Sequence, residues 1–189
     1  MPADAHWGES ACRLLDRIRP VLPRAGWTRP ESWHLTLKFL GEIAAPAADQ
    51  FASIVERSVT ACAAGDLTCS GAVMFPPHGR ARVLGVGFRS GACAEMLGNL
   101  AGVAESAARA FGMAAETHRF RPHVTLARLR EPWSSGALET FRQEIEGWEF
   151  PSWPVRRCVL YQSRLEPAGA VHTPLYVWRL GDRAPEASA

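Results

Sequence analysis

The sequence predicts one domain of mixed helices and strands, built by duplication of a single supersecondary unit. Two observations indicate this. The tetrad HLTL at residues 34–37 returns as HVTL at residues 123–126. Around both tetrads, stretches with helical spacing of apolar residues alternate with strand-like stretches, and the order of elements in the first half repeats in the second.

The first half contains two expected helices and two expected strands. Apolar residues at helical spacing predict a helix over residues 9–22, which Pro20 bends or ends. After a loop, alternation of apolar and polar residues predicts a strand over residues 32–40, which contains the first tetrad. A second helical stripe covers residues 47–63, and residues 67–75 are expected to form a strand.

The second half repeats this order and adds a strand in front. Its expected elements are a strand over residues 82–88, a helix over 93–111, a strand over 119–129 with the second tetrad, a helix over 137–145, and strands over 155–163 and 175–180. Gly112 is expected to cap the C-terminus of the longer helix. The first half lacks the opening strand, because residues 1–7 show no apolar alternation.

Length and composition set the broad class. We expect a single domain over residues 1–181, with halves of about 1–80 and 81–181 and a fraying tail at 182–189. The formal net charge of +2 is too small to indicate nucleic-acid wrapping by charge alone. No apolar run approaches the ~20 residues of a membrane span. The five scattered cysteines favour a reduced, cytoplasmic chain, expected to be a monomer.

The histidines and threonines of the two tetrads are the candidate catalytic groups. Residues two apart on a strand share a face, so each tetrad presents one imidazole beside one hydroxyl. If the two strands face each other, one histidine can accept a proton from an attacking water while the other donates to a departing oxygen. The threonines can donate hydrogen bonds to phosphate oxygens. The competing interpretation is that both histidines are half-buried remnants of the duplication.

Two longer runs resemble a known family. Residues 34–41 (HLTLKFLG) and 121–128 (RPHVTLAR) are similar to the two signatures of the two-histidine phosphoesterases, and most similar to the RNA 2′,3′-cyclic phosphodiesterases, long called 2′-5′ RNA ligases. The likeness covers roughly residues 10–180, including Phe75-Pro76 before a loop. It implies an α+β, bilobal fold, with two antiparallel sheets lining a central groove and helices outside.

The same resemblance implies an activity and roles. It implies hydrolysis of RNA or nucleotide 2′,3′-cyclic phosphates to 2′-phosphomonoesters, without metal or cofactor. His34 would donate a proton to the leaving 3′ oxygen, His123 would accept one from water, and Thr36 and Thr125 would hold the phosphate. Microscopic reversibility also allows 2′-5′ ligation. The alternatives are an esterase for another cyclic phosphate, such as an ADP-ribose derivative, and a non-catalytic RNA- or nucleotide-binding module.

Two basic residues are further candidates for substrate binding. Arg128 lies five residues after His123, so a straight strand would turn it to the opposite face, and only a bulge would bring it to the phosphate. A surface ion pair is its alternative role. Lys38 shares the face of His34 and Thr36, with simple solvent exposure as the alternative. No metal site is expected, because the two converging histidines have no carboxylate partner.

The sequence departs from the family pattern in its first residues. Members of the family usually open with an apolar strand just before the first helix, and that strand is absent here. Four arginines flank the second tetrad, and they are expected either to contact an RNA backbone or to form a solvated basic strand end. These are Arg119, Arg121, Arg128 and Arg130.

Overall fold

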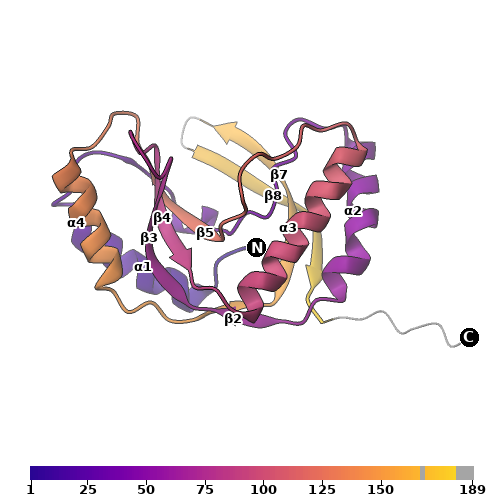
Figure 1. Ribbon diagram of the computed structural model, residues 1–189, viewed down its shortest axis with the longest axis horizontal. Coiled ribbons are helices and arrows are strands. Elements are labelled where there is room, and N and C mark those ends of the chain that lie inside the picture. Colours follow the sequence, from indigo (N-terminus) through magenta and orange to yellow (C-terminus); the bar gives the residue numbers. More distant parts are fainter. Residues whose placement is uncertain (167–168, 182–189) are drawn as a thin grey trace, which may run out of the picture.

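A computed structural model describes residues 1–166 and 169–181, and it shows two lobes joined side by side (Figure 1). The first, here the sheet lobe, is built on a four-stranded antiparallel sheet in the order β1-β5-β4-β3. Its strands are β1 (Gly26–Trp27), β5 (His123–Arg128), β4 (Val83–Phe88) and β3 (Cys69–Phe75). Helices α1 (Ala5–Ile18) and α4 (Ser135–Glu146) pack together, and α4 lies against β3.

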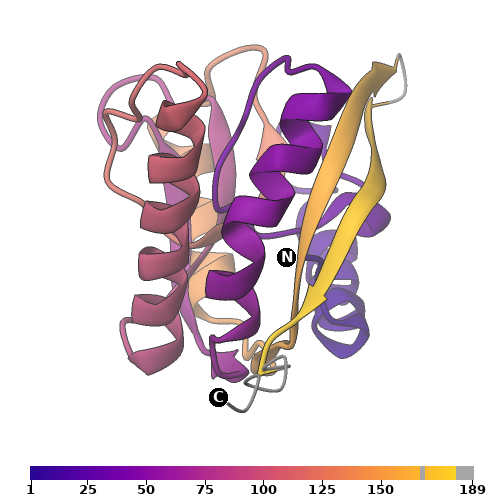
Figure 2. The ribbon, with the colours of Figure 1, turned by 90° about the vertical axis from the view of Figure 1, so that its right-hand side faces the viewer.

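The second lobe, here the hairpin lobe, contains a long antiparallel hairpin and two helices (Figure 2). Strands β7 (Arg157–Glu166) and β8 (Gly169–Arg179) form the hairpin. Helices α2 (Ala45–Thr60) and α3 (Ala92–Ala110) pack on each other, and α2 also contacts β8. The remaining elements are the 3-10 turn η1 (Pro30–Ser32) and a short antiparallel ribbon of β2 (Gly65–Leu67) with β6 (Trp153–Val155).

The expected fold class is therefore confirmed: the protein is α+β, its paired strands are antiparallel, and its helices lie on the outside (Figure 1). The lobes do not coincide with the two sequence halves. Helix α1 of the first half packs with α4 of the second, and α2 of the first half packs with α3 of the second. Each lobe thus needs both halves of the chain. The expected fraying of residues 182–189 concerns a segment outside the described residues.

The predicted strand over residues 32–40 is wrong in extent. Residues 30–32 form η1, and only His34 and Leu35 make strand-like bridges. Within the described chain no strand pairs with residues 36–40, so alternation alone does not produce a strand there. The short segment of residues 1–3 takes part of the place of an opening strand. Its Pro2 bridges His34, and Ala3 N donates to Trp33 O at 2.9 Å.

Other boundaries differ from the expected ones for local reasons. Helix α1 begins at Ala5 because the Asp4 side chain accepts from the backbone N–H groups of His6 and Trp7, and it ends at Ile18, two residues before Pro20. Strand β8 begins at Gly169 rather than at residue 175, because it pairs with β7 along its whole length. The two-residue β1 lies in the expected loop and is too short to leave a periodic signal.

An aromatic cluster joins the first helix to the first tetrad. Trp7 of α1 is fully buried, with its ring 5.9 Å from Trp33, 5.3 Å from Phe150 and 5.1 Å from Trp153. Trp33 is itself only 2% exposed, as its place on the face opposite His34 predicts. This packing fixes the backbone from which His34 projects. In the described residues no helix has the length and apolar character needed to cross a membrane.

Candidate active site

The two tetrads meet directly. Leu35 and Val124 form an antiparallel bridge, and both side chains are buried. Extended by one residue in each direction, that register puts His34 opposite Thr125 and Thr36 opposite His123, which would turn all four away from the face of Leu35 and Val124. Diagonal neighbours across such a pair have Cβ atoms roughly 7–8 Å apart. If this register holds through both tetrads, the two imidazoles are such diagonal neighbours, at a separation that suits one phosphate group.

Each histidine is oriented by a carbonyl two residues before it. The Nδ1 atom of His34 lies 2.7 Å from Ser32 O, and that of His123 lies 2.7 Å from Arg121 O. A carbonyl oxygen only accepts, so each Nδ1 carries the hydrogen and donates it. In the neutral ring this leaves Nε2 with a free lone pair. Both rings therefore offer the same nitrogen for proton transfer.

Burial favours the neutral form of both rings in the free protein. It lowers the pKa of His34 from 6.5 to about 4, and positive charge on the Met1 amino group, on His172 and on Arg128, where these groups are protonated, acts in the same direction. Burial also lowers the pKa of His123, again with Arg128 adding to the effect. An anion between the rings would favour their charged forms and raise both pKa values.

A β-bulge brings Arg128 to the site. The register of β4 with β5 shifts between Leu84 and Gly85: Leu84 pairs with Ala127, but Gly85 pairs with Thr125, so Leu126 is an extra residue. The extra residue turns Arg128 back to the exposed face, while Leu126 and Ala127 are buried. The arginine thus lies where its charge acts on both histidines.

Gly85 makes this bulge sterically feasible. A Cβ built on Gly85 would overlap the carbonyl oxygen of Val124, far inside van der Waals contact. Only glycine lets the two backbones approach this closely. Gly85 thereby supports the backbone between the two polar residues of the second tetrad.

Thr28 connects the two tetrads through the bulge. Its hydroxyl lies 2.7 Å from Thr125 O and 2.9 Å from Leu126 O, and its backbone N–H donates to Leu126 O. The Trp33 indole N–H donates to the same Thr28 hydroxyl at 2.8 Å. Since Trp33 precedes His34, one side chain couples the position of the first tetrad to that of the second. The sequence carried no signal for this role.

Lys38 has a partner on the opposite helix. Its ammonium lies 2.6 Å from a carboxylate oxygen of Glu105 on α3, and its side chain is 11% exposed. Lys38 is therefore neither simply exposed to solvent nor free on the rim of the groove. The contact of Lys38 with substrate remains a prediction. In this structure its ammonium group is already engaged by Glu105.

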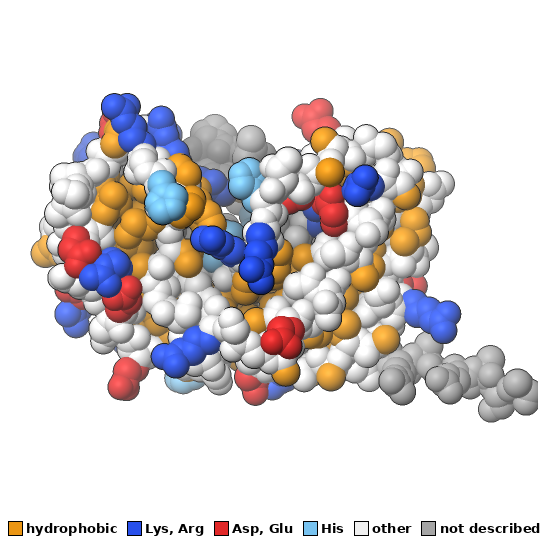
Figure 3. Space-filling model, viewed as in Figure 1, with side chains coloured by type: hydrophobic (Ala, Val, Ile, Leu, Met, Phe, Trp, Pro, Cys, Tyr) orange, Lys and Arg blue, Asp and Glu red, His pale blue; other side chains and the backbone are white. Residues whose placement is uncertain are grey.

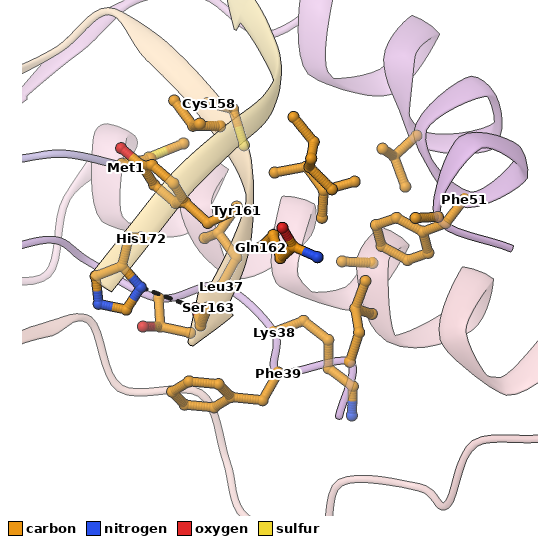
Figure 4. A pocket seen from close by; sticks show the side chains of 18 of the residues that line it. Met1, Leu37, Lys38, Phe39, Phe51, Cys158, Tyr161, Gln162, Ser163 and His172 are labelled. Atoms are coloured by element: carbon orange, nitrogen blue, oxygen red, sulfur yellow. Dashed lines mark hydrogen bonds between the residues drawn. The ribbon is translucent and has the colours of Figure 1, made fainter. Parts of the chain in front are cut away.

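A cavity of about 490 Å³ opens on the His34 side (Figure 4). Its polar lining residues include His34, Thr36 and the β7–β8 residues Gln162, Ser163 and His172, and many of its apolar lining residues come from α2 and α3. This volume is within the range of small-molecule sites. Between the lobes, the face seen in Figure 3 is hollowed, and histidine and basic side chains gather around the hollow.

Two further rings contact the histidines. Phe75 packs on His123 with ring centroids 4.6 Å apart, and His172 packs on His34 at 4.8 Å. The sequence showed no partner pattern for His172, because its contact depends on the pairing of β7 with β8. Tyr161 and Ser163 are two residues apart on β7 and therefore share a face. This alternation was the sequence signal available for this part of the site, and both residues line the same cavity. No group of three or more His, Cys, Asp or Glu in residues 1–166 and 169–181 is arranged to hold a metal ion.

Comparison with known proteins finds consistent similarity. A family model described as LigT like phosphoesterase matches residues 6–85 and 89–172. The RNA 2′,3′-cyclic phosphodiesterase of Aeropyrum pernix is 33% identical over 174 residues, which cover 86% of this chain and 92% of that protein. The protein of that name from Methanothermobacter thermautotrophicus is 25% identical over 168 residues and 89% of each chain. The crystal structure of the Thermus thermophilus protein TT0787 superposes with a TM-score of 0.70 at 25% identity, covering 93% of this chain and 94% of that one.

Proposed function

The chain belongs to the LigT like phosphoesterase family, and on that premise we propose that it hydrolyses 2′,3′-cyclic phosphates of RNA or nucleotides to 2′-phosphomonoesters. The observation that carries the proposal is the Leu35–Val124 bridge, which aligns the two tetrads in antiparallel register. The curated relatives named RNA 2′,3′-cyclic phosphodiesterase support the same reaction, at 25% and 33% identity over most of the chain.

The proposed reaction is an acid–base displacement at phosphorus. His123 accepts a proton as water attacks, the new P–O bond forms, and the bond from phosphorus to the 3′ oxygen breaks. His34 donates the proton that makes this oxygen a hydroxyl. The hydroxyls of Thr36 and Thr125, with the Arg128 guanidinium, stabilise the charge on the non-bridging oxygens. The product keeps its phosphate on the 2′ oxygen.

The electrostatics make proton loading depend on substrate. With a pKa of about 4, His34 carries almost no proton in the free protein at neutral pH. A bound phosphodiester places a negative charge beside both rings and raises the pKa of each. The donor is therefore charged mainly in the complex. If the 5′-hydroxyl of a second RNA end attacks in place of water, the same proton transfers give a 2′-5′ phosphodiester, but water at its bulk concentration favours hydrolysis.

The site needs no metal in this proposal, because the histidines supply both proton transfers. We further propose a cytoplasmic monomer, which agrees with five free cysteines and no disulfide among the described residues. The cavity beside His34 offers room for the nucleoside attached to the phosphate.

The test offers a short RNA with a 2′,3′-cyclic phosphate end, and separately a cyclic mononucleotide, with and without EDTA. We expect a 2′-phosphomonoester product, at a rate that the chelator does not change. Replacing His34 or His123 by alanine should lower kcat/KM by at least ~10²-fold, the usual effect of losing a positioned proton-transfer group. The exposed loop residue His78 provides the matched control, His78→Ala, expected to be silent.

Three outcomes would contradict the proposal. A 3′-phosphomonoester product would mean that the bond from phosphorus to the 2′ oxygen is cleaved, and not the bond to the 3′ oxygen. Activity that survives in either histidine variant would remove that ring from the mechanism. Tight binding of cyclic or product RNA with no turnover would favour the non-catalytic binding module instead.

A further inference from the structure

Each tetrad histidine packs against one aromatic ring from outside its tetrad. On the sheet lobe the ring is Phe75 of β3, 4.6 Å from His123 at an interplanar angle of 47°. On the hairpin lobe the ring is His172 of β8, 4.8 Å from His34 at 72°, an edge-to-face contact. The two lobes thus use the same device with different residues, one apolar and one titratable.

The His172 ring is itself held in place. Ser163 and His172 are direct partners in the β7–β8 ladder, and Ser163 Oγ lies 2.8 Å from His172 Nδ1 in a hydrogen bond (Figure 4). The Tyr161 ring closes the group, 5.8 Å from His172 and 6.2 Å from His34. A ring with one nitrogen fixed by the hairpin has little freedom to leave the His34 face.

We propose that His172 is a positioning residue for His34, fixing the plane of the His34 ring by edge-to-face packing while Ser163 fixes His172. The proposal rests on the proposed function, because it assumes that His34 transfers a proton. The carbonyl of Ser32 holds one ring nitrogen of His34 but leaves rotation about that hydrogen bond open. Contact with a second ring removes this freedom and keeps Nε2 aimed at the space between the tetrads.

In this proposal His172 acts on His34 through packing rather than through charge. A protonated His172 would place a positive charge beside His34 and oppose its protonation. Burial lowers the pKa of His172, which favours its neutral form. The other groups facing this pair are Tyr161 on β7, Arg128 on β5, the Met1 amino group, and Glu31 and Arg157 at an adjoining cavity.

This predicts that phenylalanine can replace His172 but alanine cannot. His172→Ala should lower kcat about 10-fold, with KM changed less than about 2-fold, because the loosened His34 ring spends less time in reactive geometry. His172→Phe, which copies the Phe75 arrangement of the other lobe, should restore kcat to within about 3-fold of wild type at pH 7–8. Ser163→Ala should have a smaller effect in the same direction. Val171→Ala, at a neighbouring exposed position on β8, is the control.

A second measurement does not depend on activity. Nitrogen NMR of the imidazoles should show the His34 Nδ1–H signal in wild type and in His172→Phe, and its broadening or loss in His172→Ala. If wild type proves inactive on cyclic phosphates, the proposed function fails, and this signal still decides the positioning role. The role is overturned if His172→Ala keeps wild-type kcat and a sharp signal, if it raises KM alone, or if His172→Phe is no better than His172→Ala.

Discussion

His123 and His34 occupy matching tetrads but very different backbones. His123 begins β5, which lies between two paired strands and pairs with β4 at Gly87. His34 lies on a segment held by two isolated bridges and by the buried rings of Trp7 and Trp33. The comparison teaches that the same side-chain constellation does not require the same scaffold. A sheet holds the backbone of His123, and two bridges with side-chain packing hold the backbone of His34.

The largest expected effect comes from disturbing the sheet lobe alone. Gly85→Ala puts a Cβ into the carbonyl oxygen of Val124, so β4 and β5 must separate or lose the bulge. We expect the free energy of unfolding to fall by about 3 kcal/mol, the range of severe overpacking, and kcat/KM to fall with it. Urea unfolding and the cyclic-phosphate assay measure these two effects.

A glycine in open space provides the control for that experiment. Gly98 lies inside α3 with nothing within 4 Å of a built Cβ, so Gly98→Ala should be neutral or stabilising by up to ~1 kcal/mol. If Gly85→Ala were as stable as Gly98→Ala, the close approach at the bulge would not limit the backbone, and the sheet lobe would be no more rigid than its counterpart.

The pH profile compares the two rings directly. The proposed mechanism needs one ring protonated and the other neutral in the free protein, and the pKa of each lies below 6.5. We therefore expect a bell-shaped kcat/KM with its maximum on the acidic side of pH 6.5, falling by up to about tenfold per pH unit above it. The kcat profile should peak at higher pH, because the bound phosphate raises both pKa values. Coinciding kcat and kcat/KM maxima above pH 7 would contradict this.

Arg128 tests whether the two rings share one electrostatic environment. Arg128→Ala removes a positive charge that lowers the pKa of both histidines, so the kcat/KM maximum should move to higher pH. Loss of a charged phosphate contact should also lower kcat/KM about 10-fold, while Arg128→Lys keeps most of it. Arg130→Ala, at a nearby exposed position, is the comparison variant. Equal behaviour of Arg128→Ala and Arg130→Ala would remove Arg128 from the site.

The smallest effect is expected at Lys38, on the hairpin side. Breaking its pair with Glu105 by Lys38→Met or Glu105→Gln should lower the thermal midpoint by a few degrees, because both side chains are partly buried. If the pair is only structural, both variants keep kcat/KM close to wild type. A loss of activity confined to Lys38→Met would instead support the substrate contact that the sequence predicts.

Local patterns predicted a large part of this molecule. The four helices lie within a few residues of their expected spans, and Trp33 is buried on the face opposite His34. Helical and strand periodicity are properties of consecutive residues, so these features are readable without a structure. The strand over residues 32–40 is overpredicted for the same reason, since its alternation says nothing about whether a partner strand exists.

The sequence by itself determined the candidate reactive groups: two histidines and two threonines in repeated tetrads, with a family likeness that points to a reaction. The tertiary structure decided how these groups are held. It mixed the two sequence halves in each lobe, inserted Leu126 as the bulge that turns Arg128, engaged Lys38 with Glu105, and placed His172 on His34. These contacts join residues far apart in the chain, and no local period records which distant side chain will fill a given space.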